Sequence, residues 1–273
     1  MMPDKKAPIG VFDSGVGGLT VAKEIMQQIP NERIIYFGDT ARVPYGSKSK
    51  TTITKFTKQI TRFLLTQNVK ALVIACNTMS AYAIDEVEKE VDLPIIGVVK
   101  PGARVAVTQT KNKRIGVIAT EGTIGSGMYE RFITNIDPEV SVLGKACPLF
   151  CPLVEEGMLD DPVTDEIARR YLKDLMDKDI DTLIMGCTHY PLLAPALKKL
   201  VGDRVRLVNP AYETARELKV MLEKEELLNE QPLTESMGHE FYVSDLAEKF
   251  RNFAINILGD PEITTEKVDI EKY

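Results

Sequence analysis

Short apolar runs alternate with amphipathic segments along most of the chain. Such brief, nearly uninterrupted runs are typical of strands that a parallel sheet buries on both faces. The runs lie at 9–12, 33–37, 71–75, 94–99, 114–118, 140–143, 182–185 and 205–208. Apolar residues recur at helical spacing in 19–28, 51–67, 80–91, 163–178, 212–226 and 246–258. The alternation predicts an α/β protein with parallel sheets.

The pattern also repeats once within the chain. Ile9-Gly-Val-Phe is matched by Ile115-Gly-Val-Ile, and Ile34 by Val140, both 106 positions further on. The run that ends at Cys76 is matched 111 positions later by the run that ends at Cys187. Three matches in the same order predict a duplicated α/β domain, and the period is too long for a solenoid. Linkers are expected at Lys100-Pro-Gly and Asn209-Pro, and 259–273 shows no clear pattern.

Charge and cysteine content narrow the class of protein. The 273 residues carry a formal net charge of −6, whereas nucleic-acid binding needs a basic surface. No apolar run approaches the roughly 20 residues that span a bilayer. The polar segment 1–8 lacks the apolar region of a signal peptide, so we expect a cytoplasmic protein with free thiols. Neither a nucleic acid nor a membrane is expected as a partner.

Cys76 and Cys187 each follow an apolar strand and precede a predicted helix. Ligands of open α/β sheets bind beyond the carboxyl ends of the strands. A helix N-terminus favours an anion, so we expect both thiols to have lowered pKa values. A cysteine in this position is often only a small buried hydrophobe. Two at matched positions, each followed by polar residues, favour a shared function in one cleft.

The other cysteines have a different setting. Cys147 and Cys151 lie in an apolar stretch interrupted by prolines, which favours packing for both. A zinc site is not expected, because Cys187-Thr-His189 has no second cluster at ligand spacing.

A glycine-rich turn, Asp13-Ser-Gly-Val-Gly-Gly18, follows the first strand. It matches neither the dinucleotide-binding fingerprint nor a P-loop, so it is a weak indication of phosphate binding. Asp13 lies where the cleft is expected, although an Asp there also suits a helix N-cap.

Several functions remain open on these residues. A dithiol redox protein is disfavoured, because the matched cysteines are not in a Cys-x-x-Cys motif. A non-catalytic anion-binding module leaves those cysteines unexplained. Pyridoxal phosphate chemistry needs a lysine, and lysines are plentiful in the chain. However, no lysine occupies either of the strand ends at which Cys76 and Cys187 lie.

Five motifs together resemble the glutamate racemases of the aspartate/glutamate racemase family. The likeness extends from about residue 9 to about 215. The motifs are Asp13-Ser-Gly-Val-Gly-Gly-Leu, Gly38-Asp-Thr-Ala-Arg-Val-Pro-Tyr-Gly, Ala75-Cys-Asn-Thr, Ala146-Cys-Pro-Leu-Phe and Gly186-Cys-Thr-His-Tyr-Pro. Cys151 and Lys100 are not motif residues of that family.

The resemblance implies two Rossmann-like domains with parallel sheets and pseudo-twofold symmetry, and an active site in the cleft between them. The first domain would comprise 1–99 plus 210–273 and the second 100–209. Cys76 and Cys187 would be the acid/base thiols, assisted by Asp13, Glu155 and His189. The implied substrate contacts are Asp13, Ser14, Tyr45, Gly46, Asn77, Thr78, Thr188 and His189.

The resemblance further implies interconversion of L- and D-glutamate without a cofactor or metal. Cys76 would deprotonate D-glutamate and Cys187 L-glutamate. The D-glutamate produced would be used in peptidoglycan synthesis. Whether the protein forms a homodimer stays an open question. A racemase acting on aspartate or another small acid is the nearest alternative.

Overall fold

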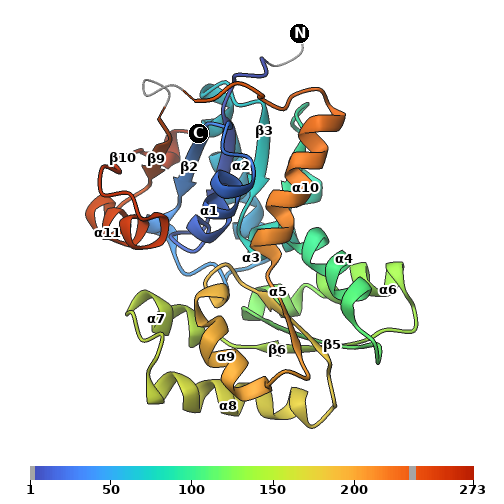
Figure 1. Cartoon of the computed structure of the whole chain (residues 1–273). Coiled ribbons are helices and arrows are strands. Elements are labelled where there is room, and N and C mark those ends of the chain that lie inside the picture. Colours follow the sequence, from blue (N-terminus) through green and yellow to red (C-terminus); the bar gives the residue numbers. More distant parts are fainter. Residues whose placement is uncertain (1–3, 234–237) are drawn as a thin grey trace.

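Two parallel sheets form the framework of the computed structural model, which describes residues 4–233 and 238–273 (Figure 1). The first three residues of the polar segment 1–8 lie outside the described residues. The strands in chain order are β1 (Ile9–Asp13), β2 (Ile34–Gly38), β3 (Ala71–Ile74), β4 (Ile95–Gly97), β5 (Arg114–Ala119), β6 (Ser141–Ala146), β7 (Thr182–Gly186), β8 (Arg206–Val208), β9 (Glu240–Val243) and β10 (Thr265–Lys267).

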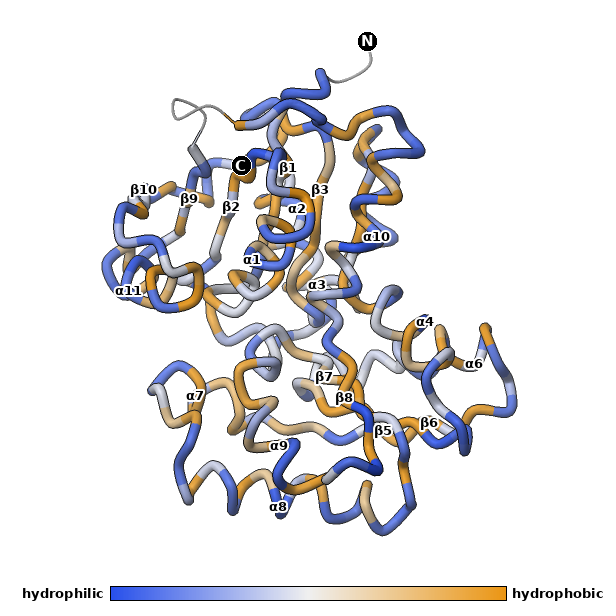
Figure 2. The backbone as a smooth tube through the Cα atoms, viewed as in Figure 1, coloured by the Kyte–Doolittle hydropathy of each residue, from blue (hydrophilic) through white to orange (hydrophobic). Residues whose placement is uncertain are grey.

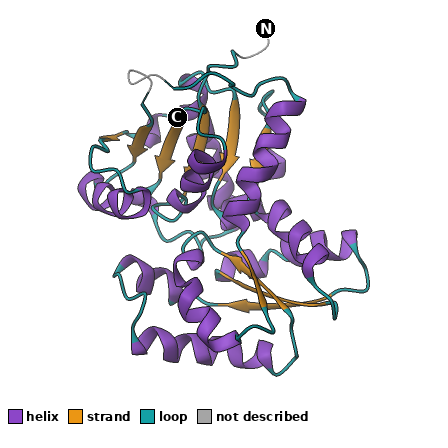
Figure 3. Cartoon of the chain, in the orientation of Figure 1, coloured by secondary structure: helices purple, strands orange, loops and turns teal. Residues whose placement is uncertain are grey.

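Helices flank both sheets (Figure 3). The α-helices are α1 (Leu19–Gln28), α2 (Lys50–Thr66), α3 (Asn77–Val87), α4 (Val99–Gln109), α5 (Glu121–Gly125), α6 (Met128–Ile136), α7 (Phe150–Glu155), α8 (Pro162–Met176), α9 (Ala194–Val201), α10 (Pro210–Lys224) and α11 (Ala247–Leu258). Short 3₁₀ helices are η1 (Thr40–Arg42), η2 (Tyr190–Leu193) and η3 (Ile270–Lys272).

The two sheets share one topology. The order is β10-β9-β2-β1-β3-β4 in the first and β6-β5-β7-β8 in the second, and all pairings are parallel. The order β2-β1-β3-β4 therefore recurs as β6-β5-β7-β8, as a duplicated domain predicts. Strands β9 and β10 extend the first sheet only. The domain limits at 99/100 and 209/210 stay a prediction.

Each sheet has an apolar core on both faces. In the first, Val11 packs with α1, α10 and α11, while its neighbour Phe12 packs with α2 and α3 on the other face. In the second, Ile118 packs with α7, α8 and α9, and Val117 with α4 and α6. The alternation of neighbouring residues between faces explains why these strands are continuously apolar. Figure 2 shows the hydrophobic strands inside and hydrophilic residues on the outer helices.

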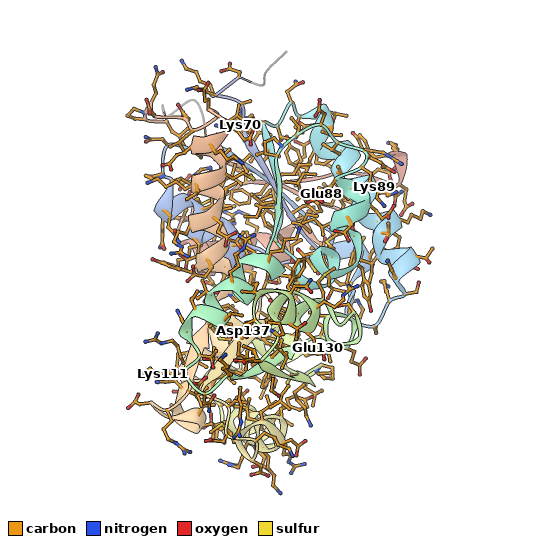
Figure 4. The ribbon with its side chains drawn as sticks, turned by 90° about the vertical axis from the view of Figure 1, so that its right-hand side faces the viewer. Lys70, Glu88, Lys89, Lys111, Glu130 and Asp137 are labelled. Carbon is orange, nitrogen blue, oxygen red and sulfur yellow. The ribbon has the colours of Figure 1, made fainter. Side chains whose placement is uncertain are left out.

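A buried ion pair helps to hold the carboxyl-terminal segment on the first sheet. Lys70 and Glu32 are almost fully buried, with Nζ 2.6 Å from Oε2. The Lys70 ammonium also donates to the carbonyl of Leu227 at 2.9 Å, and Asn229 N–H donates to Glu32 at 2.8 Å. Figure 4 shows Lys70 at the end of the first half that is remote from the second half.

One expectation about local structure is wrong, and one segment without a clear sequence pattern is structured. Lys100-Pro-Gly is not a linker but part of the first turn of α4; proline is tolerated there because the first backbone N–H groups of a helix have no intrahelical acceptor. The segment 259–273 contains β10 and η3. Among the described residues, no helix is long and apolar enough to cross a membrane.

Candidate active site

A cavity of about 420 Å³ lies where the carboxyl ends of both sheets meet. Ser14 and Cys76 reach it after β1 and β3 of the first sheet. Thr120 and Cys187 reach it after β5 and β7, the corresponding strands of the second sheet. The topology thus places four residues, two from each half, around one space.

The two thiols lie in this cavity wall and are nearly buried, with 6% and 7% exposure for Cys76 and Cys187. Cys76 is the N-cap residue of α3, and its thiol donates to Ser14 Oγ at 3.5 Å. Cys187 is followed by η2 and only then by α9, so it does not cap an α-helix as expected. Its Sγ lies 3.8 Å from His189 Nδ1.

His189 and Glu155 form a pair beside Cys187. His189 Nε2 lies 3.0 Å from Glu155 Oε1, and both side chains line the cavity. Glu155 ends α7, which brings it from a distant part of the sequence. The imidazole therefore contacts the thiol through one nitrogen and the carboxylate through the other.

Asp13 lies behind the cavity wall and is fully buried. Its carboxylate accepts the Gly15 N–H at 2.9 Å and the Thr188 hydroxyl at 3.5 Å. The N-cap of α1 is Gly18, so Asp13 is not the helix cap. It links the first half to the residue that follows Cys187.

The glycines after Asp13 allow the two halves to approach closely. A Cβ on Gly17 would lie 2.4 Å from Thr188 Oγ1 and 2.5 Å from His189 Nδ1. A Cβ on Gly18 would lie 2.4 Å from that of Asp13. Close packing against the second half therefore explains Gly17, and close packing against Asp13 explains Gly18.

A loop of the first half crosses towards the second half. Tyr45 is buried, lines the cavity and donates its hydroxyl to Asp39. The Gly46 carbonyl accepts the Gly122 N–H at 2.7 Å. A Cβ on Gly46 would lie 2.9 Å from that of Thr120, so the approach requires glycine.

The two residues after Cys76 also make contacts across the cleft. Asn77 accepts the hydroxyl of Tyr129 at 2.7 Å. Thr78 Oγ1 lies 2.9 Å from that of Thr120 and 3.2 Å from that of Thr123. Every sequence-predicted contact residue except Asp13 lines the cavity.

Burial keeps the thiols protonated in the unliganded protein. It raises the pKa of Cys76 to about 12, with a further contribution from the Asp13 carboxylate. The hydrogen bond with Cys151 and burial raise the pKa of Cys187 well above its ordinary value, while His189 opposes this. The expectation of lowered thiol pKa values is therefore wrong for this state, because desolvation outweighs helix N–H groups.

The neighbouring acids and the imidazole respond differently. Burial alone would lower the pKa of His189, but its hydrogen bonds with Cys187 and Glu155 raise it to about 10. The same bond from His189 lowers the pKa of Glu155. Burial raises the pKa of Asp13, and the charge of His189 opposes this. His189 and Glu155 thus form an ion pair near neutral pH.

Among the cavity residues that were not predicted as part of the site, two have a polar group close to a predicted site residue. Thr120 lies 106 positions after Ser14, so the repeat offset carried a signal for it. Cys151 lies on α7, is partly exposed to the cavity, and has its Sγ 3.6 Å from that of Cys187. Packing is therefore an incomplete interpretation of Cys151. Cys147 is fully buried in the core of the second half.

The arrangement defines a class of protein: a duplicated α/β fold with two thiols at equivalent strand ends facing one mostly uncharged cavity. Comparison with known proteins gives the family. The model of the Asp/Glu/hydantoin racemases matches residues 9–218. The chain belongs to this family and is an amino-acid racemase, an isomerase.

Individual relatives agree over nearly the whole chain. A glutamate racemase from Geobacter metallireducens is 49% identical over 251 residues, covering 92% of both chains. The crystal structure of a glutamate racemase isoform from Bacillus anthracis superposes with a TM-score of 0.92 at 40% identity, covering 97% of this chain and 98% of that one. The glutamate racemase from Francisella tularensis, solved with D-glutamate, gives 0.91 at 40% identity, with 98% and 100% covered.

Proposed function

We propose that this chain interconverts L- and D-glutamate by proton transfer between the substrate α-carbon and two thiols, Cys76 and Cys187. The observation that carries the proposal is the placement of these thiols at equivalent strand ends of the two halves, in the wall of one cavity. Relatives named glutamate racemases, one of them bound to D-glutamate, support glutamate as the substrate.

In the proposed reaction one cysteine acts as a thiolate and the other as a thiol. The thiolate removes the α-proton from one face of the carbon, and the thiol returns a proton to the opposite face. Cys187 starts from L-glutamate and Cys76 from D-glutamate, and the two exchange roles with direction. General acid–base steps contribute typically about 10²–10⁴-fold, so the carbanionic transition state also needs electrostatic stabilisation.

The substrate itself helps to generate the thiolate. Both thiols are held neutral by burial and by neighbouring groups. An α-ammonium group that enters this site brings a positive charge close to both sulfurs, which favours the charged form of one of them. On one side Asp13 would accept or return the displaced proton. On the other side the protonated His189 can donate a proton and the Glu155 carboxylate can accept one.

Neutral hydrogen-bond donors would bind the carboxylates of the substrate. Ser14, Asn77, Thr78 and Thr188 supply hydroxyl or amide groups in the cavity wall, and backbone N–H groups at the start of α3 add to them. No lysine is among the described residues that line the cavity, so a Schiff base with pyridoxal phosphate has no partner there. We therefore propose catalysis without a cofactor, and D-glutamate supply for peptidoglycan as the role.

The decisive experiment is circular dichroism of L-glutamate incubated with protein freed of metal and cofactor, with L-aspartate in parallel. We expect the glutamate signal to decay to zero, with one solvent deuteron incorporated at the α-carbon in D₂O. Racemisation of aspartate alone would identify the other substrate. Activity that persists after replacing both Cys76 and Cys187 by alanine would exclude the two-thiol mechanism.

A further inference from the structure

Cys151 places a third soft donor next to two groups of the active site. Its Sγ lies 3.6 Å from Cys187 Sγ, which in turn lies 3.8 Å from His189 Nδ1. The three donor atoms all lie within 4.8 Å of one another. The proposed proton transfers use Cys187 and His189 but give Cys151 no task.

The spacing of these donors suits one small metal ion. Zinc bonds of about 2.3 Å to sulfur and about 2.0–2.1 Å to nitrogen give tetrahedral edges of roughly 3.8 Å between two sulfurs and roughly 3.6 Å between sulfur and nitrogen. The observed separations of 3.6 Å and 3.8 Å are close to these edges. The third separation, between Cys151 Sγ and the His189 nitrogen, lies within 4.8 Å, so two of the three edges already fit and the third can reach its length by a side-chain adjustment.

Glu155 completes the arrangement from outside the donor set. With His189 Nδ1 towards the thiols, the opposite nitrogen Nε2 lies 3.0 Å from Glu155 Oε1. A carboxylate that orients a metal-binding imidazole through its second nitrogen is the usual support for such a ligand. This contact is independent of the sulfur spacing and points to the same ligand.

We propose that Cys151, Cys187 and His189 form an inhibitory site for Zn²⁺, with the fourth coordination position open to the substrate cavity. Two thiolates and an imidazole select zinc over magnesium or calcium, which prefer oxygen ligands. Binding releases the two thiol protons and requires an unprotonated His189. The inhibitory part rests on the proposed function, because zinc-bound Cys187 cannot exchange a proton with a substrate.

Binding is measured separately from activity by titrating Co²⁺ into the reduced, metal-free protein. We expect one equivalent to give sulfur-to-cobalt charge-transfer bands and tetrahedral visible bands, and Zn²⁺ to displace it. Cys151→Ser should weaken binding by at least about 10-fold, since loss of an outer-shell partner alone costs about 10–100-fold. Cys147→Ser is the matched control, because Cys147 is buried in the core and makes its hydrogen bond to the Lys145 carbonyl.

Activity supplies the second readout. Each variant's rate of racemisation in Zn²⁺, with a phosphine reductant present, is compared with its own rate in chelator. Zinc should inhibit the unaltered protein and Cys147→Ser alike, while Cys151→Ser should require at least about 10-fold more zinc. Cys151→Ala serves as a second variant if the serine does not fold.

Three results would overturn the proposal: no thiolate–cobalt bands, unchanged binding by Cys151→Ser, or inhibition that appears only when the reductant is omitted and that chelator does not reverse. The last would indicate a Cys151–Cys187 disulfide instead. A protein that binds cobalt through Cys151 yet racemises no amino acid would contradict the proposed function and leave the metal site standing.

Discussion

The two halves of the molecule place their thiols alike but surround them differently. Cys76 contacts the Ser14 hydroxyl and lies near the buried Asp13 carboxylate. Cys187 contacts a second thiol and an imidazole that is itself paired with Glu155. Duplication of the sheet thus fixed where the reactive groups stand, while the neighbours that tune them diverged.

The difference matters to the proposed mechanism, because each face of the substrate would then meet different assisting groups. In that proposal a carboxylate assists on the Cys76 side, and a histidine paired with a carboxylate assists on the Cys187 side. Enantiomers have equal free energies, so any variant must lose kcat/KM equally in both directions. Unequal roles of the halves are therefore visible only in reactions that need a single base.

Replacement of either thiol should have the largest effect. Cys76→Ala and Cys187→Ala should each lower racemisation by at least about 10²–10⁴-fold, because the far face then lacks its acid. Each should still eliminate HCl from one enantiomer of a β-chloro substrate analogue. Cys76→Ala should process the L-analogue and Cys187→Ala should process the D-analogue. The reaction is measured by formation of the 2-oxo acid.

Cys147→Ser is the control for this experiment and should racemise normally, because its side chain does not line the cavity. A single-thiol variant that eliminates from both enantiomers at similar rates would contradict the assignment. One mobile base serving both faces would then be the better mechanism.

The assisting groups should give a smaller, one-sided effect. Asp13→Asn should slow elimination from the D-analogue more than from the L-analogue, and Glu155→Gln should do the reverse. The decrease in elimination rate should be smaller than the about 10²–10⁴-fold that a direct acid or base contributes, because both thiols remain. Equal slowing of both analogues by both variants would show that the halves are not functionally separate.

The titration of His189 tests the surroundings of Cys187 by a measurement that does not depend on enzymatic activity. Its pKa is raised to about 10, whereas burial lowers that of His239, the other histidine. Proton NMR should therefore show one imidazole titrating near pH 10 and one below its ordinary range. Glu155→Gln should lower the pKa of His189 and leave His239 unchanged. Two imidazoles titrating together would contradict the pairing.

The same pair has a defined effect on stability. A histidine whose pKa is raised on folding stabilises the folded state fully below its unfolded pKa of 6.5. The contribution declines as pH rises and is lost above about 10. The stability difference between the protein and Glu155→Gln, measured by urea unfolding, should therefore shrink between these values.

Much of the framework could be predicted from the sequence. Apolar runs marked β1 to β8. The runs are most continuous in the central strands, which are buried on both faces, whereas β6 and β8 are edge strands with exposed positions. The repeat offset placed Cys76 and Cys187 at equivalent strand ends. Strands β9 and β10 escaped, because one alternates buried and half-buried residues and the other is a polar edge strand.

The neighbours of Cys187 could not be predicted from the pattern alone. Cys151 and Glu155 lie on α7, a six-residue helix that contains Pro152 and has no counterpart in the matched motifs. Their approach to His189 depends on how that helix packs against η2, which is a tertiary contact. The expectation of lowered thiol pKa values is wrong for the same reason. Burial of a thiol depends on the tertiary packing around the cavity rather than on the local helix.

The smallest effect should come from Ser14 and Thr120, which occupy equivalent positions of the two halves. The Ser14 hydroxyl lies 3.5 Å from Cys76 Sγ and can donate a hydrogen bond to the thiolate, which lowers the pKa of that thiol. The Thr120 hydroxyl instead accepts the Thr123 N–H and caps α5. Ser14→Ala should therefore slow elimination from the D-analogue a few-fold with unchanged stability, and shift its pH profile upward.

Thr120→Ala should cost about 1 kcal/mol of unfolding free energy, the usual value of a lost N-cap. Urea unfolding and the elimination assay on both variants separate the two roles. Matching losses in both assays would mean that the halves kept one function at this position.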